Sequence, residues 1–264
     1  MLVSLDLNDD IILSVDLNIL QNFQVYDDIV FPDFLIKKPY RDILISIARG
    51  DSKLLHIFNK AHIGESLGKD IIYQLVELDI LSILPSRESP IKINPKQKLK
   101  RELRSYKVQS IIRFKNPFYY FWFGFVEPYR IDIENSEYDR FWEYFLSHYH
   151  RCTSLVFEQL SSDIINYRFD IVSYGNYWDR KNEFDILSIT TDKKTILGEC
   201  KYKNKKICKN ELNRLISKSI VSDINADYYA LFSKNGYSNE LKNLKTPNIL
   251  LYDLSDFEIL LEIN

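Results

Sequence analysis

EFDILSITTDKKTILGECKY, residues 183–202, carries the clearest structural pattern in the chain. Two apolar segments flank a short polar turn, which indicates two neighbouring strands. Side chains two positions apart on a strand share a face, so Glu183 and Asp185 are expected to point one way, as are Glu199 and Lys201. Carboxylates and one ammonium group that converge in this manner can hold a divalent cation.

A plain structural interpretation of the same pattern stands beside this one. Glu-x-Lys is common on solvated strand faces, and an acid opposite a lysine is ordinary cross-strand pairing. The intervening Phe184 and Cys200 are expected to face a core. A further acid, Glu158, lies on a predicted helix upstream. The presence of this acid together with the acids of the two strands favours the cation site.

Around these strands the C-terminal half predicts alternating helices and strands. Helices are expected around Phe141 and, with Ser154 as its cap, around Glu158. Three strands, a helix and two further strands follow, and their ranges are 167–174, 184–190, 195–202, 210–221, 228–232 and 249–253. This order predicts a mixed sheet flanked by helices.

The order resembles the restriction-endonuclease-like, or PD-(D/E)XK, nuclease superfamily, whose core runs helix, three strands, helix, strand. In this resemblance Glu158 matches the acid of the first helix, Asp185 the strand-end aspartate, and Glu199 with Lys201 the E-x-K element. More narrowly, YWDRKNEFDIL followed by ILGECKY resembles the C-terminal domain of many archaeal and some bacterial AAA-class ATPases. The resemblance covers roughly residues 40–264.

The resemblance implies a metal-dependent nuclease that acts on DNA. Asp185 and Glu199 are the expected ligands of Mg²⁺ or Mn²⁺, and Glu158 is an outer ligand. Lys201 is expected to orient the attacking water or to offset charge that develops on the phosphate. Two alternatives stay open, because a fold does not fix a function. One is a non-catalytic DNA-binding or regulatory protein with the nuclease fold as scaffold, and the other is an effector that depends on a separate ATPase.

The N-terminal half predicts a winged helix-turn-helix. Short helices are expected at residues 40–48, 54–61 and 66–78, followed by a basic, proline-containing segment and a returning strand at 106–114. The expected fold is therefore α/β (α+β), with an αβββαβ domain of restriction-endonuclease-like type after the winged helix. The expected domains are an acidic lead-in at 1–38, a winged-helix domain with an aromatic connector at 39–130, and the nuclease-like domain at 131–264.

Positive charge is concentrated locally, although the formal net charge is only −2. Exposed basic side chains can meet DNA phosphates and give salt-dependent affinity without sequence preference. The candidates for such contacts are Lys69, Lys96, Lys98, Lys100, Arg101, Arg104 and Lys203. The alternatives are a solvated loop and a winged helix that docks a protein.

Several other features limit the range of functions. GESLGKD, residues 64–70, lacks the spacing and the hydroxyl of a phosphate-binding loop, so an ATPase partner in trans is expected in place of an intrinsic ATPase. The aromatic run at 118–126 is too short to span a membrane and predicts a buried helix at a domain junction or homodimer interface. Three cysteines without a C-x-x-C pair and no signal peptide favour a reducing cytoplasm.

Overall fold

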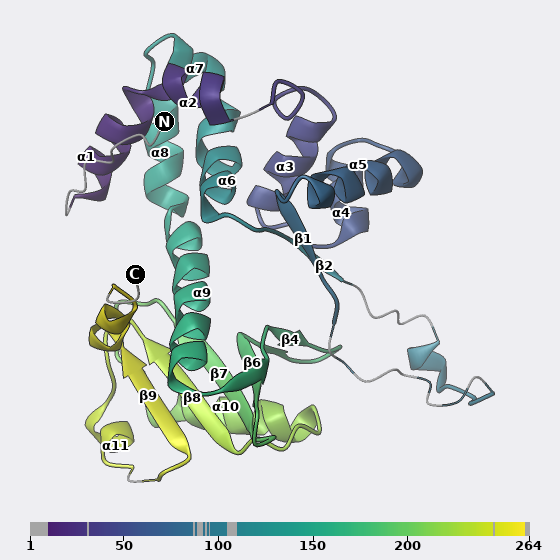
Figure 1. The fold of residues 1–264 in the computed structure, drawn as a ribbon, viewed down its shortest axis with the longest axis vertical. Coiled ribbons are helices and arrows are strands. Elements are labelled where there is room, and N and C mark those ends of the chain that lie inside the picture. The colour runs from purple at the N-terminus through teal and green to yellow at the C-terminus, as the bar shows by residue number, and fades with distance from the viewer. Residues whose placement is uncertain are drawn as a thin grey trace. The chain divides into compact units, whose positions relative to one another are not determined.

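The computed structural model describes residues 10–30, 32–86, 88, 92, 94, 96–104, 110–244 and 246–261. Helices alternate with strands, and the described strands form one five-stranded mixed sheet and two two-stranded sheets (Figure 1). Contacts divide the chain into two units. The first holds Met1–Leu84 with Ser110–Tyr149, and the second holds Pro85–Gln109 with His150–Asn264. The domain limits expected from the sequence stay a prediction beside this division.

The first unit is mainly helical. Its elements are α1 (Ile11–Val15), η1 (Asp16–Leu20), α2 (Phe23–Val30), α3 (Tyr40–Ala48), α4 (Leu54–Lys60), α5 (Glu65–Glu77), β1 (Leu81–Leu84), β2 (Ile111–Phe114), α6 (Pro117–Phe121), η3 (Trp122–Val126), η4 (Glu127–Tyr129), α7 (Arg130–Glu134) and α8 (Asp139–His148). The three predicted helices are confirmed as α3, α4 and α5. Strand β2 returns antiparallel to β1, and residues 106–109 of the expected strand lie outside the described residues.

The aromatic run forms part of the core of the first unit. All five residues of η3 are buried, and Trp122 stacks on Phe23 with ring centroids 5.6 Å apart. Phe125 packs edge to face against Phe145 of α8 at 5.4 Å. The prediction of a buried packing segment is confirmed. None of the helices in the described ranges has the length and apolar character that crossing a bilayer requires.

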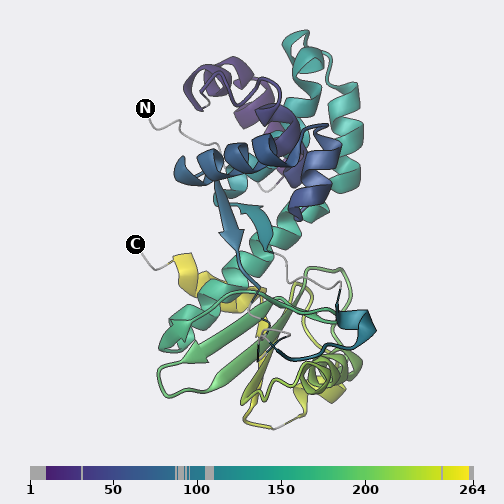
Figure 2. The ribbon, with the colours of Figure 1, turned by 90° about the vertical axis from the view of Figure 1, so that its right-hand side faces the viewer.

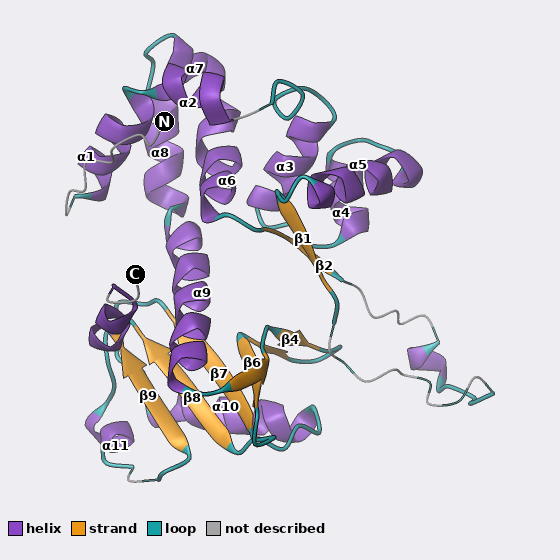
Figure 3. Ribbon diagram, in the orientation of Figure 1, coloured by secondary structure: helices purple, strands orange, loops and turns teal. Residues whose placement is uncertain are grey.

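The second unit contains the mixed sheet (Figure 3). Its elements are η2 (Arg101–Leu103), α9 (His150–Arg168), β3 (Ile171–Ser173), β4 (Tyr177–Trp178), β5 (Glu183–Phe184), β6 (Ile186–Thr190), β7 (Thr195–Lys201), α10 (Lys209–Val221), β8 (Tyr228–Ser233), α11 (Asn239–Lys242), β9 (Ile249–Asp253) and η5 (Leu254–Leu261). The strand order is β3-β6-β7-β8-β9. Strands β3, β6 and β7 are antiparallel neighbours, whereas β7, β8 and β9 are parallel.

Helices cover both faces of this sheet, with α9 on one side and α10 on the other (Figure 2). Leu212 and Leu215 of α10 pack against Leu197 in one cluster, and Phe157 and Ile164 of α9 belong to a second. Successive residues of β7 alternate between the two clusters, as strand geometry requires. A sheet buried on both faces explains the near-continuous apolar character of its strands.

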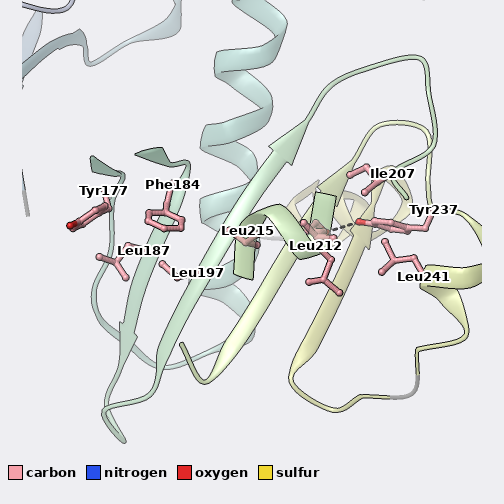
Figure 4. Packing of buried hydrophobic residues seen from close by; sticks show 10 residues of the cluster. Tyr177, Phe184, Leu187, Leu197, Ile207, Leu212, Leu215, Tyr237 and Leu241 are labelled. Carbon is pink, nitrogen blue, oxygen red and sulfur yellow. Dashed lines mark hydrogen bonds between the residues drawn. The ribbon is translucent and has the colours of Figure 1, made fainter. Parts of the chain in front are cut away.

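Three expectations about local structure need correction. Ser154 does not cap its helix, because α9 already begins at His150. Strand β4 was not expected, and it pairs with β5 to form a separate two-stranded sheet. Phe184 does face a core, but it packs in the same cluster as Leu197 (Figure 4), so the acidic face of β7 is itself partly covered by apolar side chains.

Candidate active site

Strand β7 places Glu199 and Lys201 on the face that α10 covers. Both follow Leu197 in the alternation of the strand, and Leu197 packs in the α10 cluster. The ammonium nitrogen of Lys201 lies 2.5 Å from Oε1 of Glu199. The two side chains are 21% and 12% exposed, so the pair is largely withdrawn from water. The sequence prediction that these residues share a face is therefore confirmed.

Asp185 reaches the same strand from the break between β5 and β6. The antiparallel register pairs Ile186 with Gly198, which brings the preceding Asp185 alongside the next residues of β7. Its Oδ2 accepts a hydrogen bond from the backbone N–H of Cys200 at 2.7 Å. The side-chain amide of Asn176 donates to the Asp185 carbonyl at 2.9 Å, which fixes the backbone of the break.

Neighbouring groups shift the ionisation of both carboxylates. Burial and the nearby charge of Glu199 raise the pKa of Asp185 to about 6, against a hydrogen bond from Cys200 and the charge of Lys201, which lower it. Burial opposes ionisation of Glu199 as well, but hydrogen bonds from Lys201 and Lys218 outweigh it and lower the pKa of Glu199. Burial opposes the charged form of Lys201, and the bond to Glu199 outweighs it and raises the pKa of Lys201. Glu199 is therefore the firmly charged acid of the site.

Lys218 is a member of the site that the sequence did not indicate. It lies on α10, and its ammonium nitrogen is 2.8 Å from Oε2 of Glu199. The same nitrogen donates to the backbone carbonyl of Glu183 at 3.1 Å. Both oxygens of the Glu199 carboxylate thus accept from lysines. The only sequence signal was a cation on the last turns of an amphipathic helix, which is usually solvated.

Glu158 lies on α9, the helix that covers the other face of the sheet. The side chain of Cys200 is hydrogen-bonded to Ser161 of α9, and Cys200 packs against the cluster that contains Phe157. Burial raises the pKa of the Cys200 thiol well above its ordinary value, and the charges of Asp185 and Glu158 add to this effect. The structure therefore brings Asp185, Glu199 and Lys201 together and places Glu158 beside the opposite face of β7.

The predicted nucleic-acid contacts fall in three places. Lys69 lies on α5, where it pairs with Glu65 at 2.6 Å. Lys203 is exposed just beyond β7. The remaining predicted contacts are exposed in the segment between β1 and β2, and they are Lys96, Lys98, Lys100, Arg101 and Arg104. This segment groups with the second unit, where Ser86 Oγ donates to the Trp178 carbonyl at 2.9 Å.

The carboxylates of Asp185 and Glu199 are ligands of the type that a hard divalent cation prefers. Mg²⁺ takes oxygen ligands and is commonly held by one or two carboxylates together with water and substrate phosphates. Asp185, in the break before β6, and Glu199, on β7, supply two such carboxylates. Within the described ranges, no three His, Cys, Asp or Glu side chains come together closely enough to hold a metal ion by themselves. Both oxygens of Glu199 already accept from ammonium groups, so a cation would share this carboxylate with Lys201 and Lys218.

Comparisons with known proteins give a family match to part of the chain. The family model DUF234, described as archaea bacterial proteins of unknown function, matches residues 122–215. No curated protein matches the chain. A solved structure, a refined half-complex from a tetradecameric assembly of Thermococcus gammatolerans McrB AAA+ hexamers with bound McrC, is similar at 9% identity and a TM-score of 0.28. That match covers 85% of this chain and 68% of the other, and a TM-score this low does not establish a shared fold.

Proposed function

We propose that the chain is a divalent-metal-dependent nuclease of the PD-(D/E)XK type that hydrolyses DNA phosphodiesters. The arrangement of Asp185, Glu199 and Lys201 carries this proposal. Asp185 lies in the break between β5 and β6 and accepts from the backbone N–H of Cys200, which stands between Glu199 and Lys201 on β7, although Asp185 precedes Glu199 by 14 positions in sequence. Helix α9, strands β3, β6 and β7, helix α10 and strand β8 follow in this order, with the two-residue strands β4 and β5 between β3 and β6.

Each residue has a role in this proposal. Asp185 and Glu199 bind Mg²⁺ or Mn²⁺, which supplies a Lewis acid for the phosphoryl oxygen and lowers the pKa of a bound water. With a cation on these acids, the ammonium group of Lys201 would face the water or the phosphate. Glu158, which lies on α9 beside the opposite face of β7, is proposed only as an outer acid. Lys201 would therefore orient the water or offset charge that develops on the phosphate.

A nicking assay tests the proposal. The purified chain is expected to nick supercoiled plasmid with Mg²⁺ or Mn²⁺ and not with EDTA. Lys201→Ala is expected to lower the rate by at least about 100-fold, the typical effect of removing a group that stabilises developing charge. Lys193→Ala, in the turn before β7, is the matched control and should cut at the wild-type rate. Cleavage that survives Lys201→Ala would rule out this mechanism.

A second candidate is a non-catalytic DNA-binding or regulatory protein. The observation that favours it is the double occupation of Glu199, whose oxygens accept from Lys201 and Lys218 at 2.5 and 2.8 Å. Such a network can also serve as a structural ion-pair cluster. A protein of this kind would bind duplex DNA and take up no Mn²⁺, so calorimetry separates the two candidates.

The remaining parts of the proposal concern partners. Helices α3, α4 and α5 followed by the β1–β2 hairpin suit a winged helix-turn-helix, which would hold duplex DNA through its basic segment. A separate ATPase acting in trans and a homodimer are further proposals. Gly68 lies inside α5, where an added Cβ would meet the Phe58 ring at 2.5 Å, so it serves helix packing. Gly68 therefore gives no support to a phosphate-binding loop in this segment.

A further inference from the structure

Lys218 joins the two parts of the chain that carry the acids. Its ammonium nitrogen bonds Glu199 on β7 and the carbonyl of Glu183 on β5, two residues before Asp185. Helix α10 packs across this face of the sheet (Figure 4), and this packing brings Lys218 within reach of both oxygens. Lys218 is therefore part of the site and not of the solvated face of the helix.

The ammonium group is held from several sides and still has access to solvent. Besides its two oxygen partners, it lies 6.0 Å from the centroid of the Phe184 ring, within the range of a cation–π contact. A lysine ammonium has three N–H donors. Two serve Glu199 and Glu183, and the side chain remains 31% exposed. A third donor can therefore reach a ligand on the solvent side.

The charge balance of the site favours an anionic ligand there. Asp185 and Glu199 contribute two negative charges, and Lys201 and Lys218 contribute two positive ones. A bound divalent cation makes the sum positive, and a positive, partly buried site attracts phosphate. Lys201 is the group beside the reacting phosphate in the proposed function, which leaves Lys218 for another contact.

We propose that Lys218 binds a backbone phosphate of DNA beside Glu199. This inference rests on the proposed function, because it takes DNA as the ligand of the same site. Lys218 then has two tasks: it restrains one oxygen of Glu199, and it fixes the strand relative to the acids. A lysine with only the first task would orient Glu199 without touching DNA.

The two roles differ in the salt dependence of binding. Each phosphate contact of duplex DNA contributes about 0.9 to the slope of log affinity against log salt concentration. The experiment measures anisotropy of a short fluorescent duplex in Mg²⁺ over a series of salt concentrations. It uses Lys201→Ala as the parent, so that the duplex is not cut, and adds Lys218→Ala, Lys218→Arg or Lys209→Ala to it.

Lys209→Ala is the matched control. It removes the same charge from α10, and its partner is Glu240 at 3.3 Å, outside the site. Lys218→Ala is expected to lower affinity about 5- to 10-fold and to reduce the slope by about 0.9 relative to Lys209→Ala. Lys218→Arg is expected to restore the slope. Thermal unfolding of each variant verifies that it folds.

The outcomes separate this inference from the proposed function. Equal slopes for Lys218→Ala and Lys209→Ala would overturn the inference, as would a parent that binds no duplex, whether or not the wild-type chain cuts plasmid. A smaller slope for Lys218→Ala alone would support it. The same smaller slope with a wild-type chain that cuts nothing would keep Lys218 as a phosphate contact and remove the hydrolytic proposal.

Discussion

The carboxylate of Asp185 accepts a hydrogen bond from the backbone N–H of Cys200 at 2.7 Å. Asp185 belongs to neither β5 nor β6, whereas Cys200 lies inside β7 between Glu199 and Lys201. The bond therefore fixes a side chain from a break between strands against the strand that carries the other site residues. It is the contact that makes one site of two separate sequence motifs.

Asp185→Asn should stabilise the protein at high pH. Because burial and the Glu199 charge raise the pKa of Asp185 to about 6, the folded state binds a proton more tightly than the unfolded state does. The free energy of unfolding therefore falls as pH rises from about 4 to 6, by at most roughly 3 kcal/mol. Asparagine keeps the acceptor for Cys200 without the charge. The variant should exceed the wild type by about 1–3 kcal/mol at pH 8 and match it near pH 4.

Urea unfolding at the two pH values measures this difference. Asp192→Asn is the control, because hydrogen bonds from Lys194 and Thr190 lower the pKa of this exposed carboxyl, the opposite direction from Asp185. No gain should appear at pH 8 for the control. An Asp185→Asn variant that is less stable than the wild type at pH 8 would show that the carboxylate is not under electrostatic strain.

Gly198→Ala should destabilise the second unit. An added Cβ would lie 2.9 Å from the Cβ of Ile186 on the neighbouring strand, and neither atom can move without the backbone. Overpacking of this kind costs about 1–3 kcal/mol. Gly64→Ala is the control, since no atom lies within 4 Å of its added Cβ. Denaturation curves that coincide for the two variants would contradict the close approach of β6 and β7.

Glu127→Gln should destabilise the first unit. Glu127 is fully buried, and its carboxylate accepts from Arg41 at 2.7 Å and from Arg130 at 2.8 Å. Removing the charge takes the buried counter-ion from Arg41 and Arg130, which costs about 3–5 kcal/mol. Glu134→Gln, which removes an exposed partner of Arg130, should cost no more than about 1 kcal/mol. Tryptophan fluorescence during urea unfolding, to which Trp122 and Trp142 of the first unit contribute, reports both variants, and equal losses would contradict the buried role of Glu127.

Replacing basic residues of the segment between β1 and β2 should weaken binding to the same extent for DNA of any base sequence. Lys98 and Lys100 are exposed, and two lost phosphate contacts should reduce the salt slope by about 2. Fluorescence anisotropy compares the double variant Lys98→Ala/Lys100→Ala with a control, Lys205→Ala/Lys206→Ala, which removes two lysines from outside this segment. An unchanged slope in the first variant would assign this segment to a solvated loop.

Much of the second unit follows from its sequence, because its strands are apolar runs bounded by turns. β6, β7, β8 and β9 and helix α10 lie within a few residues of their predicted limits. β4 has only two residues, Tyr177 and Trp178, and no periodicity can be recognised over that length. The start of α9 was placed too late, because Ser154 resembles a cap and His150 does not.

The site was predicted where strand alternation determines it and missed where tertiary packing does. Glu199 and Lys201 share a face by geometry alone. Lys218 joins them because α10 packs on that face, and its distance from Glu199 along the chain gives no signal. Alternation also predicts that Phe184 faces a core away from the acids, whereas it packs in the same cluster as Leu197, on the face of β7 that carries Glu199.

Titration of Mn²⁺ into the metal-free chain shows whether Asp185 and Glu199 form a cation site. If Asp185 and Glu199 form a cation site, calorimetry should show one Mn²⁺ bound per wild-type chain and none by the double variant Asp185→Asn/Glu199→Gln. Both substitutions keep the shape of the side chains, and circular dichroism verifies that the double variant folds. Equal Mn²⁺ uptake by the two proteins, or no uptake by the wild type, would contradict the claim.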